Sequence, residues 1–237
     1  MSFRTFVPMK RFFLCFCWGL LMTLTGYAQE TNLLRDSLKT VTELVGYYPD
    51  SIDLRLQKAA LNMQLEQWEY AKDEYDYVIK LQPENLTAHF YRAYANERLF
   101  RYRFARFDYE SVLTVAPANF EARLGLALLN YKDKRYQESM DQINILVQQH
   151  PDSAVAYAAR AGMEKEREMY SLAEYDYSKA MSIDPLNTDY ILARADVRII
   201  LGELNKARED LDLLVSLGIP RSSLTAYYRK VRKRDKK

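Results

Sequence analysis

Hydrophobic and polar residues alternate along this chain with the spacing of helices that turn one face to water. Residues 86–119 show two stretches of about a dozen residues with helical periodicity, joined by a short turn and closed by a proline. The same pattern returns every 34 residues. Two series of landmarks keep this period, namely Pro49, Pro83, Pro117, Pro151 and Pro185, and Ala59, Ala93, Ala127, Ala161 and Ala195. The sequence therefore predicts one continuous array of helix pairs.

The period places five helix pairs in the chain. We expect them at residues 52–85, 86–119, 120–153, 154–187 and 188–221. The fifth pair is less regular, because Leu204 and Leu211 replace aromatic residues and Pro220 falls one residue late. This irregularity indicates that the array ends there.

A single helix should cap each end of the array. Residues 29–51 contain one amphipathic helix that ends like the second half of a repeat, and its apolar stripe consists of Leu34, Leu38, Val41 and Val45. Residues 222–237 contain a last helix, with Ser222 or Ser223 as N-cap, and a basic tail. The apolar face of this helix consists of Leu224, Tyr227, Tyr228 and Val231. Such caps keep the end repeats of an array soluble.

Small and large residues recur at fixed places within each pair. Alanine at the eighth position and a small residue at the twentieth should let the helices approach closely, whereas large residues at the seventeenth and twenty-fourth should fill the space between them. The twentieth positions are Ala71, Ala105, Ser139, Ala173 and Ala207. The seventeenth are Trp68, Tyr102, Tyr136, Tyr170 and Leu204, and the twenty-fourth are Tyr75, Tyr109, Ile143, Tyr177 and Leu211.

Charges at two further positions vary together. The seventh positions read Lys58, Arg92, Leu126, Arg160 and Arg194, and the twenty-third read Glu74, Asp108, Gln142, Asp176 and Asp210. The third pair, which lacks the cation, also lacks the anion. Because a buried charge needs a partner, we predict a salt bridge between the two helices of the other four pairs. The alternative interpretation makes these cations a ligand site.

These positions resemble those of the tetratricopeptide repeat family, in which aromatic, small and tyrosine positions and a closing proline recur over 34 residues. The chain departs from the family pattern at the seventh position, where the family has leucine. The resemblance implies an all-α fold, a right-handed α-solenoid of antiparallel helix pairs with capping helices at both ends.

The resemblance also implies a groove, lined by positions 2, 5, 9, 12 and 13 of the first helices, that holds a segment of a partner protein. The groove residues of this chain are Leu56, Met63, Phe90, Tyr94, Glu97, Arg98, Leu124, Leu128, Tyr131, Lys132 and Lys165. Exposed apolar groups clustered with a few charges are typical of protein-binding regions. The alternative is that Phe90, Tyr94 and Leu128 only pack against neighbouring helices.

The N-terminus has the features of a secretory signal peptide. Arg4, Lys10 and Arg11 precede an apolar run of 13 residues, and small residues at Gly26 and Ala28 suit cleavage after Ala28. An uncleaved membrane anchor is the alternative, but a spanning helix needs about 20 apolar residues. We therefore assign residues 1–28 to a cleaved signal and expect an exported protein, periplasmic or extracellular.

The sequence offers few groups for catalysis. Both cysteines lie within the predicted signal, and the two histidines, His89 and His150, stand far apart and are interpreted as surface residues. The chain has only seven glycines, too few for a phosphate-binding glycine loop. We therefore expect no cofactor, no metal site and no enzymatic activity, and regard an enzyme that uses groove carboxylates as a remote alternative.

A non-enzymatic scaffold or adaptor, which binds another exported or membrane-bound protein in the groove, is the favoured function. A second hypothesis makes the chain a module attached to an envelope surface by its basic end, since residues 221–237 carry eight basic residues and a single acid, Asp235. Contact with anionic membrane would then use residues 229–237. The alternative interpretation of residues 221–237 is a tail that only keeps the protein soluble. Nucleic acid is not an expected partner.

Overall fold

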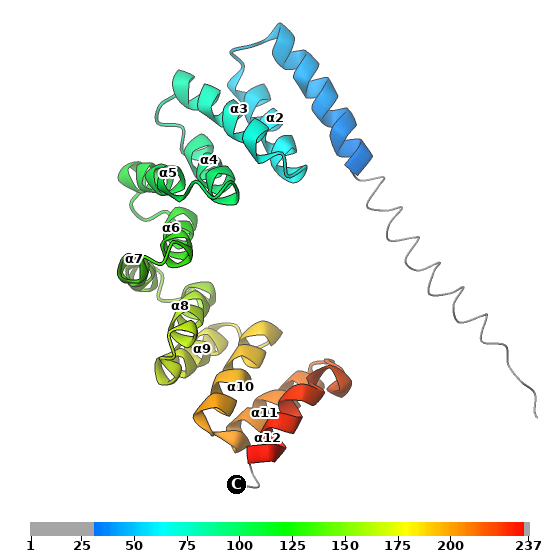
Figure 1. Cartoon of the computed structure of the whole chain (residues 1–237), viewed down its shortest axis with the longest axis vertical. Helices are drawn as coiled ribbons and strands as arrows, with labels where there is room; N and C mark the ends of the chain where they lie inside the picture. The colour runs from blue at the N-terminus through cyan, green and yellow to red at the C-terminus, as the bar shows by residue number, and fades with distance from the viewer. Residues whose placement is uncertain (1–30, 235–237) are drawn as a thin grey trace, which may run out of the picture. The chain divides into compact units, whose positions relative to one another are not determined.

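The structure is a computed structural model in which residues 31–234 are described, and the regular structure among them is helical (Figure 1). The predicted signal peptide and the last three residues of the basic tail lie outside the described residues. Within residues 31–234, no helix combines the length and the apolar character that a membrane span requires.

The helices follow the 34-residue period of the sequence. A helix over residues 31–47 comes first. The first helices of the pairs are α2 (Ile52–Gln64), α4 (Leu86–Arg98), α6 (Phe120–Lys132), α8 (Ala154–Glu166) and α10 (Thr188–Leu201). The second helices are α3 (Trp68–Leu81), α5 (Tyr102–Val115), α7 (Tyr136–Gln149), α9 (Tyr170–Ile183) and α11 (Leu204–Ser216). A 3₁₀ turn, η1 (Arg221–Leu224), leads into α12 (Thr225–Arg234).

Contacts within the chain divide it into two compact units. The boundary lies between Asp108 and Tyr109, inside α5. The first unit holds the helices up to the middle of α5, and the second holds the rest. The two units are described separately below.

A side-chain cap fixes the start of every first helix. Each cap is a serine or asparagine whose side-chain oxygen accepts a hydrogen bond from a backbone N–H in the first turn, which satisfies a donor that lacks a helical partner. The capping residues are Ser51, Asn85, Asn119, Ser153 and Asn187. The second helices α3, α7, α9 and α11 have no such side-chain cap. The hydrogen-bonded turn from the preceding first helix thus determines where they begin.

That turn uses a left-handed backbone conformation in every repeat. Four of the five residues concerned are not glycine, namely Glu66, Phe100, Lys134 and Glu168, with φ between 56° and 62°. The fifth repeat has Gly202, with φ of 82°. A side chain with a Cβ atom is strained in this region by about 1 kcal/mol or more, so four repeats hold the turn at some cost in stability.

The small landmark positions lie at the helix contacts, as predicted. The alanines at the eighth position have no exposed surface. The residues at the twentieth position also have no exposed surface. Four of them are alanine, and the fifth, Ser139, donates a hydrogen bond from Oγ to the carbonyl of Ala127 at 2.8 Å. A small residue therefore marks each close approach of two helices, and the one polar member finds a backbone partner there.

The seventeenth and twenty-fourth positions, which carry large residues, differ in how deeply they are buried. The twenty-fourth position is buried in every repeat, as predicted. The seventeenth is only partly buried, and Tyr136 is 38% exposed, so the prediction that these side chains fill the space between helices is wrong in part. The physical reason is their place in the fold, because each is the first residue of a second helix and lies beside the open turn.

Both capping helices bury the predicted stripes. Val41 and Val45 of the first described helix are buried, and Leu34 and Leu38 are partly buried. At the other end, Leu224, Tyr228 and Val231 join a cluster with the apolar residues of α10 and α11. Tyr227 packs against this cluster from its edge. The predicted N-cap at Ser222 or Ser223 is replaced by η1, which turns the chain into α12.

Candidate functional site

Arginine and lysine residues at the seventh position are engaged in ion pairs within the fold. Lys58 contacts Glu74 at 2.7 Å, and Arg194 contacts Asp210 at 2.7 Å. Arg92 and Arg160 each form two hydrogen bonds with the carboxylates of Asp108 and Asp176. The four predicted salt bridges are therefore present. Because the paired carboxylates are almost fully buried, each needs a basic partner, and removal of Arg160 would leave the carboxylate of Asp176 without one.

In the third repeat, a residue at another position pairs with the twenty-third residue. Leu126 is buried, and Gln142 instead accepts a hydrogen bond from Arg123 at 2.7 Å. Arg123 is the fourth residue of its repeat. The fourth residue of the first repeat, Arg55, likewise contacts Glu74 at 2.7 Å. The twenty-third position therefore also receives donors from the fourth position of the facing helix, and in the fifth repeat from Arg198 at the eleventh position, which pairs with Asp210 at 2.9 Å. Only the seventh-position donors were predicted from the sequence.

The histidine at the fourth position of the second repeat is not a surface residue. His89 is buried, its Nδ1 lies 2.9 Å from Asp108, and its Nε2 lies 2.8 Å from the carbonyl of Pro83. His150 is partly buried against the ring of Phe120. The expectation of two surface histidines is therefore wrong, and the buried carboxylate of Asp108 is the physical reason for His89.

The same arginines also connect neighbouring repeats. Nη1 of each seventh-position arginine donates to the twenty-fifth residue of the preceding repeat. The pairs are Arg92 with Asp76 at 2.6 Å, Arg160 with Asn144 at 3.0 Å and Arg194 with Ser178 at 3.0 Å. One guanidinium thus holds both the two helices of its own pair and the second helix of the pair before. The seventh-position cations therefore serve to hold the helices together, which is the interpretation that the sequence favoured over a ligand site.

A carboxylate is buried at the eleventh position of the fourth repeat. Glu164 is 5% exposed, and its Oε2 has no hydrogen-bond partner within the described part of the chain. Burial, together with the neighbouring carboxylate of Asp176, raises the pKa of Glu164 to about 7, against the opposing charge of Arg160. Glu164 is therefore a proton-binding group near neutral pH.

The first unit brings six of the predicted groove residues onto its first helices. Leu56 and Met63 lie on α2, and Phe90, Tyr94, Glu97 and Arg98 lie on α4. Tyr94 is 40% exposed and meets the ring of Trp68 edge-on at 6.0 Å. Arg98 lies over the same Trp68 ring at 4.9 Å. These contacts hold Tyr94 and Arg98 in place while part of each side chain faces water.

A pocket of about 460 Å³ lies among these helices. We call it the Tyr91 pocket, and it is lined by Leu56, Gln57, Ala60, Met63, Gln64, Tyr75, Thr87 and Tyr91. Tyr91 is 44% exposed, stacks on the buried ring of Tyr75 at 6.1 Å and meets Phe90 edge-on at 5.2 Å. The pocket is mostly apolar, with two amide side chains at its edge, and this make-up suits a side chain of a bound peptide.

The second unit carries the other five predicted residues. Leu124, Leu128, Tyr131 and Lys132 lie on α6, and Lys165 lies on α8. Leu128 is 46% exposed, whereas Leu124 and Tyr131 pack against the core of their repeats. Burial and a hydrogen bond to Glu166 raise the pKa of Tyr131 to about 12, so its hydroxyl stays protonated. Lys165 forms an ion pair with Asp196 at 2.7 Å.

The predicted groove residues thus form two groups, one in each unit. The sequence analysis did not assign Tyr91, Gln57 or Trp68 to the site. Tyr91 and Gln57 stand at the sixth position of their repeats, beside the fifth and ninth positions that it used. A helical wheel of α2 and α4 places the sixth position next to that face, which is the signal that could have found them.

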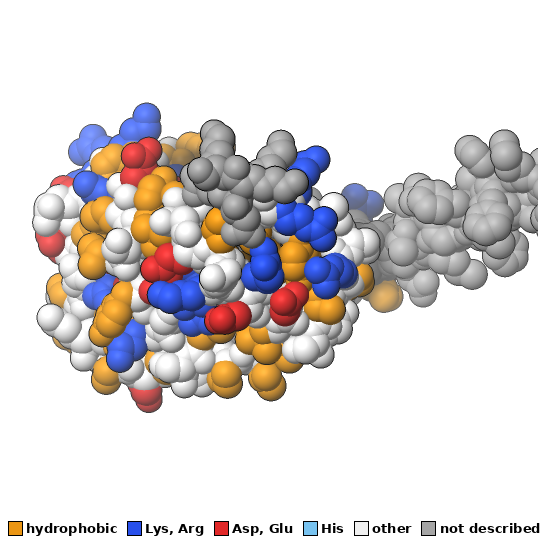
Figure 2. Space-filling model, turned by 90° about the horizontal axis from the view of Figure 1, so that it is seen from below, with side chains coloured by type: hydrophobic (Ala, Val, Ile, Leu, Met, Phe, Trp, Pro, Cys, Tyr) orange, Lys and Arg blue, Asp and Glu red, His pale blue; other side chains and the backbone are white. Residues whose placement is uncertain are grey.

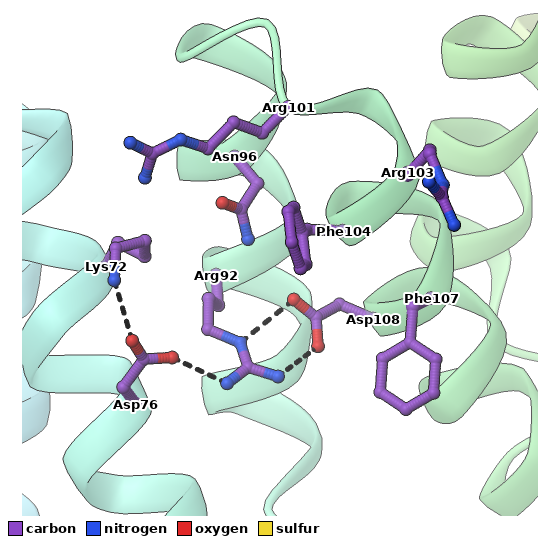
Figure 3. A pocket seen from close by; sticks show the side chains of 9 residues that line it. All are labelled: Lys72, Asp76, Arg92, Asn96, Arg101, Arg103, Phe104, Phe107 and Asp108. Atoms are coloured by element: carbon purple, nitrogen blue, oxygen red, sulfur yellow. Dashed lines mark hydrogen bonds and ion pairs between the residues drawn. The ribbon is translucent and has the colours of Figure 1, made fainter.

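A larger pocket lies among α3, α4 and α5 in the first unit. We call it the Phe104 pocket, and its volume is about 830 Å³. Lys72 and Asp76 of α3, Arg92 and Asn96 of α4, the turn residue Arg101, and Arg103, Phe104, Phe107 and Asp108 of α5 line it (Figure 3). This pocket was not predicted.

The molecular surface carries both charged and apolar side chains. On the face that Figure 2 shows, basic and acidic side chains are interspersed with hydrophobic ones. Among residues 31–234, no group of three or more histidine, cysteine, aspartate or glutamate side chains has the arrangement to hold a metal ion.

Comparison with protein families gives one match. Residues 101–154 match the family model described as tetratricopeptide repeat. This segment covers the second helix of the second repeat and all of the third repeat. A comparison with curated proteins gives no significant match.

Several solved structures have the same fold. A tetratricopeptide repeat protein from Parabacteroides merdae ATCC 43184 aligns over 91% of this chain and 84% of its own, with a TM-score of 0.63 and 22% identity. YrrB aligns over 77% of this chain and 94% of its own, with a TM-score of 0.56 and 16% identity. Yeast Tom70 aligns over 84% of this chain and 42% of its own, with a TM-score of 0.64 and 12% identity. The chain therefore has the all-α fold of a tetratricopeptide repeat solenoid.

Proposed function

We propose that this chain is an exported, non-enzymatic scaffold that binds a segment of another exported or membrane-bound protein on its first helices. The observation that carries the proposal is the Tyr91 pocket, together with the half-exposed rings of Tyr91 and Tyr94 on α4. Tyrosine and tryptophan are the side chains that most often anchor protein interfaces, because they bury a large area and lose little conformational freedom on binding.

The contacts of these rings prepare the surface for a ligand. Tyr91 is held by the buried Tyr75, and Tyr94 is held by Trp68. Side chains that are fixed before binding lose less entropy when a ligand orders them. The polar residues Gln57, Gln64 and Thr87 at the pocket edge can orient a peptide backbone.

The known structures are consistent with this use of the fold. YrrB, which shares the fold at 16% identity, is described as a protein with an unusual peptide-binding site. Repeat folds of this kind support many functions, so the aromatic surface, rather than the fold, is the basis of the proposal. Export rests on the basic, apolar and small-residue pattern of residues 1–28.

The test is capture of partners from an envelope fraction by purified residues 29–237. Wild type would be compared with a Tyr91→Ala, Tyr94→Ala double variant, and loss of such hot-spot residues should weaken binding of the true partner about thirtyfold. The matched control is Tyr70→Ala, because Tyr70 is an exposed tyrosine on α3 that lines neither pocket.

Two outcomes would reject the proposal. If the double variant captures the same proteins as strongly as wild type, the first helices do not bind the partner. If only a chain that ends before Arg221 fails to bind, and salt weakens the binding of wild type steeply, the basic end attaches the protein to an anionic surface instead.

A further inference from the structure

The Phe104 pocket has a composition that the repeat fold does not require. Phe104 and Phe107 occupy the nineteenth and twenty-second positions of the second repeat, and they are 66% and 62% exposed. In the third and fifth repeats the same two positions carry charged residues, Glu138 and Asp141, and Lys206 and Glu209. The fold therefore accepts charged residues at these positions, so the repeat does not require phenylalanine at position 104.

The charges around Phe104 favour an anionic ligand. Four cationic side chains and two carboxylates line the pocket. Both carboxylates are already used, because Asp76 and Asp108 accept hydrogen bonds from Arg92. The sequence that leads into the pocket, residues 98–107, contains four arginines and no acid.

Two of the cations are accessible to a ligand. Arg103 is exposed on α5. Arg101 is 42% exposed and forms a surface ion pair with Glu69 at 2.9 Å. Such surface pairs contribute little to stability, so Arg101 can exchange Glu69 for a carboxylate of a ligand at small cost.

The pocket is recessed between three helices. Arg92 lies at its floor with only 17% of its side chain exposed, and hydrogen bonds to α3 and α5 hold it in place. Figure 3 shows the ring of Phe104 standing between Asn96 and Asp108, beside Arg92. A ligand on Phe104 would therefore contact an apolar ring beside the fixed guanidinium group of Arg92.

We propose that the Phe104 pocket is a second binding site, which takes an acidic peptide segment with an aliphatic or aromatic side chain next to a carboxylate. The apolar side chain would pack on Phe104. The carboxylate would pair with Arg101 or Arg103, since guanidinium groups bind carboxylates through two parallel hydrogen bonds. A narrow chain suits a recessed pocket of this volume better than the flat surface of a bilayer does.

The site differs from the first-helix surface of the proposed function, and its test separates the two. A phage library of random 12-residue peptides would be selected on wild type, on a Phe104→Ala, Arg101→Gln double variant and on the Tyr91→Ala, Tyr94→Ala double variant. Peptides that require the Phe104 pocket should disappear with the first variant, remain with the second, and be rich in aspartate or glutamate beside leucine or phenylalanine.

Individual peptides from this selection would then be synthesised and measured by fluorescence anisotropy. Phe104→Ala should weaken binding about thirtyfold, and Arg101→Gln should weaken it several-fold and reduce its dependence on salt. The matched control is Tyr70→Ala with Lys80→Gln, an exposed tyrosine and lysine on α3 outside the pocket. A thermal melt of each variant establishes that it is folded.

Three results would overturn the proposal. The selection on wild type and on the Phe104 variant could return the same peptides. The peptides that depend on the pocket could lack acidic residues. Vesicles with anionic headgroups could bind wild type but not the Phe104 variant while no peptide does so, in which case the surface binds membrane.

Discussion

At the scale of single residues, the eleventh position shows how one polar site varies along the array. Asn62, Asn96 and Asn130 occupy it in the first three repeats, Glu164 in the fourth and Arg198 in the fifth. The three asparagines and Glu164 are buried. Glu164 is the member that can lose a charge near neutral pH, because its pKa is raised to about 7.

Glu164→Gln should make the protein more stable at pH 8 and remove part of its pH dependence. The pKa of a glutamate in the unfolded chain is about 4.3, so the folded state binds the extra proton between that value and about 7. Stability should therefore fall as pH rises through this window and stay reduced above it. A neutral amide can donate to Asp176 at every pH, and the gain at pH 8 should be about 1–3 kcal/mol.

Urea denaturation at pH 5 and pH 8 measures this effect. Asn130→Asp provides the control, since it places a carboxylate at the same position of the preceding repeat and should introduce a similar pH dependence. If wild type and Glu164→Gln lose the same stability between the two pH values, Glu164 does not titrate as described.

The residues also show why part of the polar network was predictable and part was not. The pairs between the seventh and twenty-third positions were visible because both members vary together along the chain. Arg123 and His89 were not, because the fourth position reads Arg55, His89, Arg123, Tyr157 and Ile191 and has no regular chemistry. Their role follows only from the distance of that position to the buried carboxylate or amide on the facing helix.

At the scale of helices, two glycines in the middle of first helices differ in their surroundings. A Cβ atom at Gly125 of α6 would lie 2.8 Å from the ring of Tyr109, which is 2% exposed and cannot move aside easily. A Cβ atom at Gly162 of α8 would meet Tyr177 at 3.7 Å, an ordinary contact. The same substitution should therefore have opposite effects at the two sites.

Gly162→Ala should stabilise the protein by about 0.4–1 kcal/mol, because alanine reduces the entropy of the unfolded chain and favours the helix. Gly125→Ala also reduces the entropy of the unfolded chain, but its methyl group would collide with the ring of Tyr109. It should therefore destabilise the protein by about 1–3 kcal/mol. Thermal melts followed by circular dichroism would measure both. Equal shifts in Tm for the two variants would show that Tyr109 has room to move.

Helix positions were the part of the fold that the sequence predicted best. Proline and alanine recur at fixed places and set the phase of the repeat, because proline ends a helix and alanine allows a close approach of two helices. The seventeenth position was predicted less well, because Tyr136 lies beside an open turn and its burial depends on how neighbouring helices cover it. The Phe104 pocket was missed for a related reason, since its residues come from three helices and no single helix pattern combines them.

At the scale of the whole molecule, stability should be distributed along the chain rather than held in one core. The last cluster is an example, because Leu224, Tyr228 and Val231 of the C-terminal segment cover Ile191 and Leu211 of the fifth repeat. Repeat arrays of this kind unfold locally when an end is exposed.

Deletion of residues 220–237 should therefore increase amide hydrogen exchange in α10 and α11 and leave exchange in α2 and α3 unchanged. Hydrogen exchange measured by mass spectrometry would locate the effect. Deletion of residues 235–237 alone is the control, because it keeps Leu224, Tyr228 and Val231. A uniform increase across the described helices would contradict a distributed array.

The groove remains a prediction at this scale. In the first unit, Leu56 and Met63 line the Tyr91 pocket, whereas the predicted residues of α4 lie outside its lining; in the second unit, Leu124, Leu128 and Tyr131 lie together on α6. The sequence could identify the helix face but not which of its positions form a pocket, since that depends on side-chain packing between repeats.

The arginines that join neighbouring repeats have a consequence for how such a chain can grow. Each of them reaches back to an oxygen atom in the preceding repeat, and that oxygen comes from an aspartate, an asparagine or a serine. A duplicated or transplanted repeat would therefore find an acceptor behind it without a matched mutation. Recombination in front of a repeat that carries this arginine could change the number of repeats and the binding surface, while the new junction kept its hydrogen bond.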